Sequence, residues 1–327
     1  MKIDVSGARL PKVLMADCIR SAHEGGSHGG AYLVDLELGT YEKVLDWNDP
    51  TIDWEGRGSK RGLRGIAFHG DEILIAASDE VFAFDRDFRI RRSFRNRYLG
   101  YCHELFLDGG TLYVASTLYD SVLALDLASG NFTRGWMFRV TFDKDPRTNA
   151  DPGPARPSVV AYDPAGDAGP EAGDTVHLNS VWVEQGRVFF SGLRPPYMLC
   201  VDDAGTVRKY ADIPTWTHNA RPFRGGVLCN STGKDSICHL DLKGNVLKEF
   251  PVVRYAEAAL TNVPSGTDIA RQAFGRGLLA TDDGLIIGSS SPSTISVYAF
   301  ESGSLIKSVN ITMDVRNAPH GLALWPY

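Results

Sequence analysis

Short runs of apolar residues recur along the chain at a spacing of roughly 40 residues, and each run follows a polar or basic residue. The six runs begin at Arg64, His103, Asn179, Asn219, Arg276 and His320. The gaps between these residues are 39, 76, 40, 57 and 44 residues, so two of the gaps correspond to one period plus an insertion. A period near 40 with several short strands in each unit is typical of a β-propeller. The sequence therefore predicts an all-β fold in which equivalent positions of every blade face one central axis.

The unit that begins at Arg64 shows the expected blade most clearly. Residues 64–68 and 72–77 are nearly all apolar, which is typical of strands with both faces buried between neighbouring blades. Residues 80–85 continue this pattern, whereas residues 89–95 are charged, as expected of an outer edge strand. Glycine paired with Asp, Asn or Lys between the runs is the chemistry of hairpin turns. Each unit is therefore predicted to be an antiparallel sheet.

The two ends of the chain together supply the strands of one blade. Residues 320–325 form a first strand with no strands after it, while residues 12–16, 31–36 and 41–47 form later strands with no first strand. We expect the C-terminal strand to enter the N-terminal blade and close the ring, because an open ring would leave an unpaired edge. The prediction is a six-bladed propeller formed as a single domain by residues 1–327.

Two insertions interrupt the period. Residues 138–175 are rich in Pro, Asp, Gly and Ala, with a strand pattern only at 158–162, and residues 251–275 include a short helix-forming run at 255–260. Long loops in compact domains are commonly functional lids or mobile segments. Both insertions lead into first strands, so we expect them at the mouth of the axis, where they would serve as lids.

Composition narrows the classes of partner and site. Hydrophobic residues make up 43% of the chain and the formal net charge is −6. No lysine or arginine run is present, which argues against nucleic acid or an anionic membrane as a partner. The first 18 residues lack a signal-peptide pattern and no apolar run is long enough to span a bilayer, so a cytoplasmic location is expected. The five cysteines lack Cys-x-x-Cys spacing and are expected to be buried thiols.

Half of the eight histidines fall at or within two residues of the start of a predicted first strand. They are His103, His177, His218 and His320. Imidazoles from four blades that converge on one axis suit a divalent transition metal such as Fe, Zn, Mn or Cu. Three or four neutral histidines can hold such an ion and leave a position open for water or substrate. The four residues are the predicted metal ligands.

Basic and amide side chains occupy the equivalent positions of the other blades. Arg64 and Arg276 are predicted to bind the substrate, because guanidinium groups suit a carboxylate, phosphate or sulfate. Glu104 is a candidate to orient a metal ligand, and Asn179 and Asn219 offer neutral hydrogen bonds, so these three are the candidate catalytic residues. The expected partner is a small anionic molecule, and the leading hypothesis is a metal-dependent enzyme.

Two other functions fit the same pattern. One is a metal-free transferase of sulfo or phosphoryl type, in which an axial histidine is the nucleophile or general base and the arginines bind the transferred anion. The other is a non-catalytic propeller that binds a ligand or a protein, because the fold does not fix the function. The chain contains no Gly-rich phosphate loop, no nucleophile elbow and no His-Glu-x-x-His motif that would decide between them.

Four local runs in the chain are Arg61-Gly-Leu-Arg-Gly-Ile-Ala-Phe, Cys102-His-Glu, His177-Leu-Asn-Ser-Val and His218-Asn-Ala-Arg-Pro. Together they resemble a bacterial family of six-bladed propeller proteins of unassigned function. This resemblance implies the fold and no specific chemistry. The chain differs from gluconolactonase and senescence-marker propellers, which bind a divalent ion through Glu, Asn and Asp, because Glu104 is its one acidic residue at a strand start. It also lacks the Trp-Asp and Gly-His marks of WD propellers. Its axial residue types are similar to the His, Arg and Asn of arylsulfate sulfotransferases. This similarity is consistent with the alternative function of a metal-free transferase.

Overall fold

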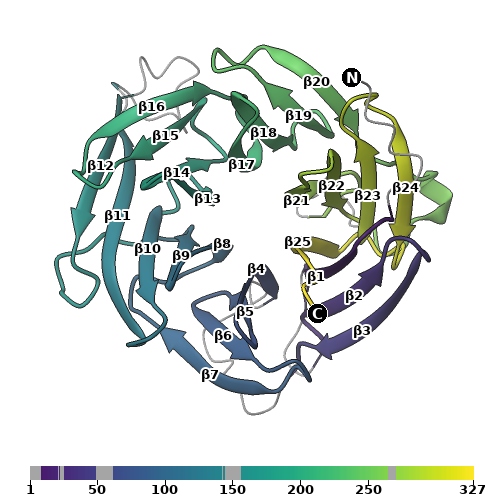
Figure 1. Ribbon diagram of the computed structural model, residues 1–327, viewed down its shortest axis with the longest axis horizontal. Helices are drawn as coiled ribbons and strands as arrows, with labels where there is room; N and C mark the ends of the chain where they lie inside the picture. The colour runs from purple at the N-terminus through teal and green to yellow at the C-terminus, as the bar shows by residue number, and fades with distance from the viewer. Residues whose placement is uncertain are drawn as a thin grey trace.

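The chain folds into six antiparallel sheets arranged in a ring around a central axis (Figure 1). The computed structural model describes residues 9–20, 22, 26–48, 62–141, 143, 156–263 and 270–327. One strand of each sheet lines the axis, and these inner strands are β4 (Leu63–His69), β8 (Cys102–Asp108), β13 (Leu178–Glu184), β17 (Thr217–Phe223), β21 (Gly275–Ala280) and β25 (Asn317–Leu324). Each of the six inner strands contains the polar residue from which the period was recognised. The predicted six-bladed propeller is confirmed.

The remaining strands of each blade follow outward from the inner strand. In the second blade they are β5 (Glu72–Ala77), β6 (Glu80–Phe84) and β7 (Ile90–Arg95). In the fourth they are β14 (Arg187–Gly192), β15 (Tyr197–Val201) and β16 (Val207–Asp212). In the fifth they are β18 (Gly226–Ser231), β19 (Ser236–Leu240) and β20 (Val246–Pro251), and in the sixth β22 (Leu285–Ser290), β23 (Thr294–Ala299) and β24 (Leu305–Asn310).

Burial across a blade follows the hydrophobic pattern of its strands. Every residue of β6 is buried, and β5 is buried except at Glu72, because both faces of these strands pack against neighbouring blades. The outer strand β7 is mostly exposed, with Phe94 as its buried residue. Between the first two blades, Trp47 is fully buried with its ring centroid 5.0 Å from that of Phe82. The core therefore consists of apolar layers between the blades, and the polar residues at the starts of the inner strands line the axis.

The ring closes through the first blade, as the two ends of the sequence predicted. Its sheet has the order β25-β1-β2-β3, with β1 at Lys12–Ile19, β2 at Gly29–Asp35 and β3 at Thr40–Asp46. Strand β25 pairs antiparallel with β1 from Val13 opposite Leu324 to Ile19 opposite Asn317. Figure 1 shows the yellow C-terminal strand lying inside the purple N-terminal strands. The last strand of the chain thus supplies the inner strand that the first blade lacks.

The first insertion contains more regular structure than its composition predicted. The third blade has five strands, because β9 (Thr111–Ser116) and β10 (Ser121–Asp126) are followed by a long β11 (Asn131–Thr141) and by β12 (Arg156–Tyr162). Strand β11 runs through residues 138–141, so the insertion begins later than position 138. Its pairing with β12 gives the mostly exposed 156–162 segment a partner at the outer edge. The lid expectation for residues 142 and 144–155 lies outside the described residues.

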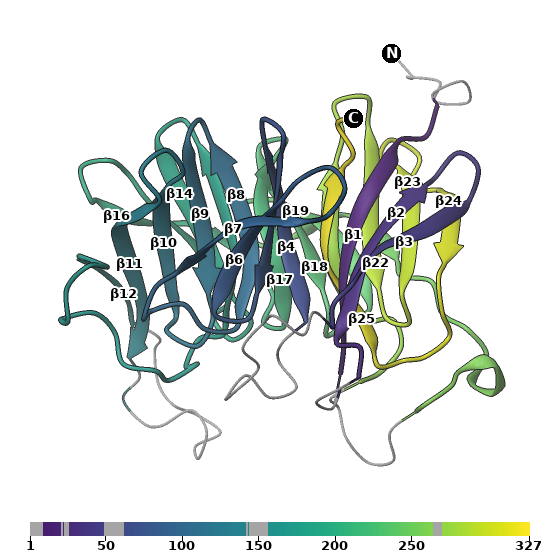
Figure 2. The ribbon, with the colours of Figure 1, turned by 90° about the horizontal axis from the view of Figure 1, so that it is seen from below.

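The second insertion contains the expected short helical turn, and its end reaches the axis. Residues Glu257–Ala259 form a single 3-10 turn, η2, with no buried residue. Phe274, at the end of the insertion, places its ring centroid 5.7 Å from that of His218. Figure 2 shows this segment and the loop before β13 on the same face of the ring, opposite the C-terminus. Both insertions therefore lead to the mouth where the inner strands begin; a role as lids remains a prediction.

The five cysteines are all free and buried, as expected. Within the part of the chain that the structure describes, no helix has the length and apolar character needed to cross a bilayer.

Candidate metal and anion site at the propeller axis

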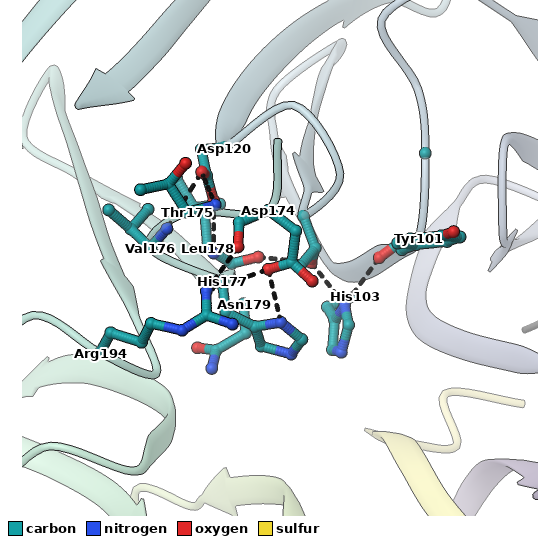
Figure 3. A network of polar contacts seen from close by, with 12 residues as sticks. Tyr101, His103, Asp120, Asp174, Thr175, Val176, His177, Leu178, Asn179 and Arg194 are labelled. Atoms are coloured by element: carbon teal, nitrogen blue, oxygen red, sulfur yellow. Dashed lines mark hydrogen bonds and ion pairs between the residues drawn. The ribbon is translucent and has the colours of Figure 1, made fainter. Parts of the chain in front are cut away.

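Three of the predicted histidines meet at the mouth of the axis. His103 lies on β8, His177 immediately precedes β13, and His218 lies on β17, so three consecutive blades contribute one imidazole each. One ring nitrogen of each lies within 4.8 Å of the others, and the ring centroids of His103 and His177 are 5.2 Å apart. Nitrogen ligands about 2.0–2.1 Å from one ion lie at most roughly 4 Å apart, so a small inward rotation would complete the site. Figure 3 shows His103 and His177 pointing into the same space.

The fourth histidine lies beside this group. His320 on β25 has its ring centroid 5.6 Å from that of His103, but it is not one of the three whose nitrogens meet. Its Nδ1 lies 2.8 Å from Ala318 O and 3.4 Å from the Cys18 sulfur. Its Nε2 is buried and has no hydrogen-bond partner among the described residues. The structure thus brings together three of the four predicted metal ligands and places the fourth next to them.

Hydrogen bonds fix the tautomer of His103. Its Nδ1 lies 2.7 Å from Tyr101 O and 2.6 Å from Thr117 Oγ1, and the Thr117 hydroxyl donates to Leu178 O at 2.5 Å. A carbonyl oxygen can only accept, so Nδ1 carries the proton and Nε2 keeps its lone pair. A ring N–H held by a backbone carbonyl is the usual arrangement behind a metal-bound histidine. His320 has the same arrangement through Ala318 O.

His177 is held by a carboxylate in place of a carbonyl. Its Nδ1 donates to Asp174 Oδ1 at 2.8 Å, and Arg194 also contacts this carboxylate at 3.3 Å (Figure 3). Burial alone would raise the pKa of Asp174, but the hydrogen bond from His177 and the charge of Arg194 bring it below its usual value. The carboxylate is therefore ionised and fixes the Nδ1 proton, which leaves Nε2 available to a metal.

The backbone at His177 is anchored by a side chain from the neighbouring blade. His177 has a φ of 53°, in the left-handed region that non-glycine residues seldom adopt. One carboxylate oxygen of Asp120 accepts the N–H groups of Thr175 at 2.6 Å and Val176 at 3.0 Å, and the other accepts that of Leu178 at 3.3 Å (Figure 3). These bonds hold the loop on both sides of His177 and so set the direction of its ring.

Burial and nearby positive charge keep His103, His218 and His320 neutral. The pKa of His103 lies well below its usual value because the ring is buried and Arg64 is near. Burial and the charge of Arg276 lower the pKa values of His218 and His320 in the same way. Neutral imidazole is the form that coordinates a metal, so no proton has to be displaced from these nitrogens near pH 7.

Three arginines surround the histidines with positive charge. Arg64 lies on β4, Arg276 on β21, and Arg20 directly follows β1. Burial and the charges of Arg20 and Arg64 lower the pKa of Arg276 well below its usual value. The Nε atom of each of the three is buried without a hydrogen-bond partner among the described residues, and none of the three is ion-paired with a carboxylate of those residues. Arg64 and Arg276 are buried and Arg20 is half-buried, and Arg64 also donates to Cys102 O at 3.3 Å. Guanidinium groups without a carboxylate partner are suited to bind an anion.

A second polar layer lies one residue further along the inner strands. Glu104 Oε1 accepts the side-chain amide of Asn219 at 3.2 Å and contacts Arg221 at 3.4 Å. Burial raises the pKa of Glu104, and the charge of Arg221 and the bond from Asn219 partly offset this. The hydrogen bonds and ion pairs of Glu104 go to this layer and not to a histidine. Asn179 donates to Thr217 O at 2.9 Å, so its amide links β13 to the neighbouring inner strand. These contacts do not test the predicted catalytic roles.

Sequence reasoning missed several residues of the site. Arg20 lies at the end of a strand and outside the 40-residue period, so periodicity gave no sign of it. Phe274 stacks beneath Arg276, with the guanidinium carbon 4.2 Å from the ring centroid. Asp174 could have been found from its position three residues before His177, since an acidic residue close to a strand-start histidine can hold its ring. Asp120 carries no local signal, because its function depends on a contact between blades.

Comparison with known proteins supports the fold and leaves the chemistry open. No protein-family model matches the chain, and no curated protein matches it. A protein of unknown function from Bacteroides caccae is similar in structure, with a TM-score of 0.56, 11% identity, and coverage of 97% of this chain and all of that one (100%). A chain of the nidogen–laminin complex gives a TM-score of 0.59 at 9% identity, covering 95% of this chain and 97% of the other. Virginiamycin B lyase from Staphylococcus aureus gives a TM-score of 0.48 at 11% identity, covering 80% of this chain and 74% of the other. The fold expected from the resemblance to bacterial propellers of unassigned function is confirmed.

Proposed function

We propose that the protein is an enzyme that uses a divalent transition metal at the propeller axis to act on a small organic anion. His103, His177 and His218 would hold the ion, which is one of Fe, Zn, Mn or Cu, with His320 beside it. Arg20, Arg64 and Arg276 would bind the anion. The observation that carries the proposal is that Nδ1–H of His103 and of His177 is fixed, so both rings offer Nε2 to the same space.

Three protein ligands leave positions on the ion for water or substrate. When bound, the metal would polarise the substrate as a Lewis acid, or would activate water or dioxygen. The guanidinium groups would fix the substrate's charged end, and the lowered pKa values of His103 and His218 keep both rings in the coordinating form. His320, with its buried unpartnered Nε2, is placed to accept a proton or a hydrogen bond from the bound molecule.

The arginines make metal and anion binding interdependent. A doubly charged ion close to three guanidinium groups is repelled by them unless an anion lies between the charges. An anion should therefore raise the affinity for the metal, and the metal should raise the affinity for the anion by the same factor.

Sulfate tests this coupling directly. We expect saturating sulfate to raise the affinity for zinc about 10-fold, a typical size for such coupling. Zinc affinity is measured by competition with a fluorescent chelator at constant ionic strength. Arg276→Gln should reduce the effect to less than about 2-fold, whereas Arg224→Gln, which alters an exposed arginine paired with Glu301, should leave it unchanged. Zinc affinity that sulfate leaves unchanged or lowers in the unaltered protein would contradict the proposed anion site.

The metal-free transferase is the second candidate, and the unpaired arginines favour it as much as they favour the metalloenzyme. The Nε2 lone pairs of His103 and His177 would then serve as nucleophile or general base in place of metal ligands. The two candidates differ in metal content, and only the transferase would leave a covalently modified histidine. A non-catalytic propeller would bind the anion without turnover.

A further inference from the structure

The axial channel contains a cavity of about 290 Å³ lined by residues that follow the polar layer along the inner strands. Its wall is formed by five inner strands with Trp182 from the sixth, β13. Phe68, Leu107 and Leu324 lie at or next to the last residues of their strands, so the cavity extends toward the face on which the C-terminus lies in Figure 2. The histidine site lies toward the opposite mouth, where the inner strands begin.

The outer part of this cavity is apolar and aromatic. The ring centroids of Phe106 and Trp182 are 4.5 Å apart, and aliphatic side chains such as Leu279 complete the wall. The guanidinium carbon of Arg221 lies 4.8 Å from the ring centroid of Trp182, which fixes one face of the indole. A concave, mainly apolar wall with a few convergent polar groups is typical of a small-molecule site.

The inner end of the cavity is polar and adjoins the positive charge of the axial site. Glu104 and Arg221 offset one another's charge there. The Nε atom of Arg221 and the Nε2 atom of His320 are both buried without a partner among the described residues, and both side chains line the cavity. Gly65 and Leu278 line the cavity one and two residues after Arg64 on β4 and Arg276 on β21, so both arginines lie toward this end.

We propose that the substrate is an organic anion with an aromatic ring. Its charged end would lie against Arg64 and Arg276, and its ring would lie in the cavity against Phe106 and Trp182. Placement of the charged end depends on the proposed function, whereas placement of the ring depends on the cavity alone. The cavity thus selects the class of molecule that the histidine site can act on.

Three probes that share a three-carbon chain test this placement by calorimetric titration: 3-phenylpropionate, propionate, which lacks the ring, and 3-phenylpropan-1-ol, which lacks the charge. Phenylpropionate should bind at least about 10-fold more tightly than either of the others, because only it satisfies both ends of the channel. Trp182→Leu should reduce its advantage over propionate to less than about 3-fold and leave propionate binding unchanged. Trp216→Leu, which alters an exposed tryptophan, is the matched control and should have no effect.

A second variant protects the test against a folding defect. If Trp182→Leu lowers the melting temperature, Leu279→Phe narrows the same cavity without removing the indole and should also abolish the preference for phenylpropionate. Equal affinities for phenylpropionate and propionate in the unaltered protein would overturn the proposal, and so would a preference that survives both variants.

The titrations are run on zinc-loaded protein and on protein treated with EDTA, so that the two proposals fail separately. A preference for phenylpropionate in a chain that binds no metal would support the cavity and reject the metalloenzyme. Zinc binding without this preference would support the metal site and overturn the substrate class.

Discussion

Replacing His103 with alanine is expected to lower the affinity for the metal by at least about 100-fold. Loss of a residue that merely orients a ligand commonly costs 10–100-fold, so loss of a ligand should reach the upper end of that range. The ring of His103 neighbours those of the other three axial histidines, with centroids 5.2 Å from His177, 6.3 Å from His218 and 5.6 Å from His320. Competition with a chromogenic chelator gives the affinity, and His218→Ala should behave in the same way.

The control for these variants is His69→Ala. His69 ends β4, at the opposite end of an inner strand, and is not one of the three histidines that meet at the axis. The His69→Ala variant should retain the metal with unchanged affinity. A metal that survives both His103→Ala and His218→Ala would show that the ligands have been wrongly assigned.

Deleting residues 317–327 is expected to lower the midpoint of thermal unfolding by about 10 °C or more, or to cause aggregation. The deletion removes β25, the partner of β1, and leaves the first blade without an inner strand. It also removes Leu322, which is buried, and Trp325, which stacks on Phe88 with ring centroids 6.2 Å apart. Burial of an apolar side chain contributes about 1.5–3 kcal/mol, and each kcal/mol corresponds to roughly 2–4 °C in a chain of this size.

A shorter deletion separates the effect of β25 from that of the terminus itself. Removal of residues 326–327 takes away Tyr327, an exposed side chain that donates to Gly70 O at 2.6 Å. It should change the midpoint by no more than a few degrees. The midpoints are measured by circular dichroism. If the protein lacking residues 317–327 had the same midpoint as the full chain, β25 would not be closing the ring.

The blade pattern was predictable because propeller strands are buried on both faces and recur with the period of the blade. The apolar runs that became β5 and β6 and the charged run that became β7 show this directly. Ring closure was also predictable, since an inner strand at His320 had no strands to follow it. The extension of β11 to Thr141 and its pairing with β12 were missed, although Phe138 and Val140 are buried, because the Pro-, Asp- and Gly-rich composition after them suggested a loop and β12 is mostly exposed.

The site was predictable only where a residue occupies the repeated position at the start of an inner strand. This placed His103, His218, Arg64 and Arg276 at the axis. The hydrogen bond from His177 to Asp174, the loop bonds to Asp120 and the approach of Arg20 depend on how separate blades meet, which the period does not encode. The aromatic cavity was missed for the same reason, since Phe106 and Trp182 read simply as apolar strand residues.

The central claim is that the axial histidines hold a metal, and elemental analysis of protein purified without an affinity tag tests it most directly. The account predicts about one transition-metal ion per chain, either as purified or after reconstitution. Protein that remains metal-free after purification and after separate reconstitution with Fe(II), Zn, Mn and Cu would contradict it and favour the metal-free transferase.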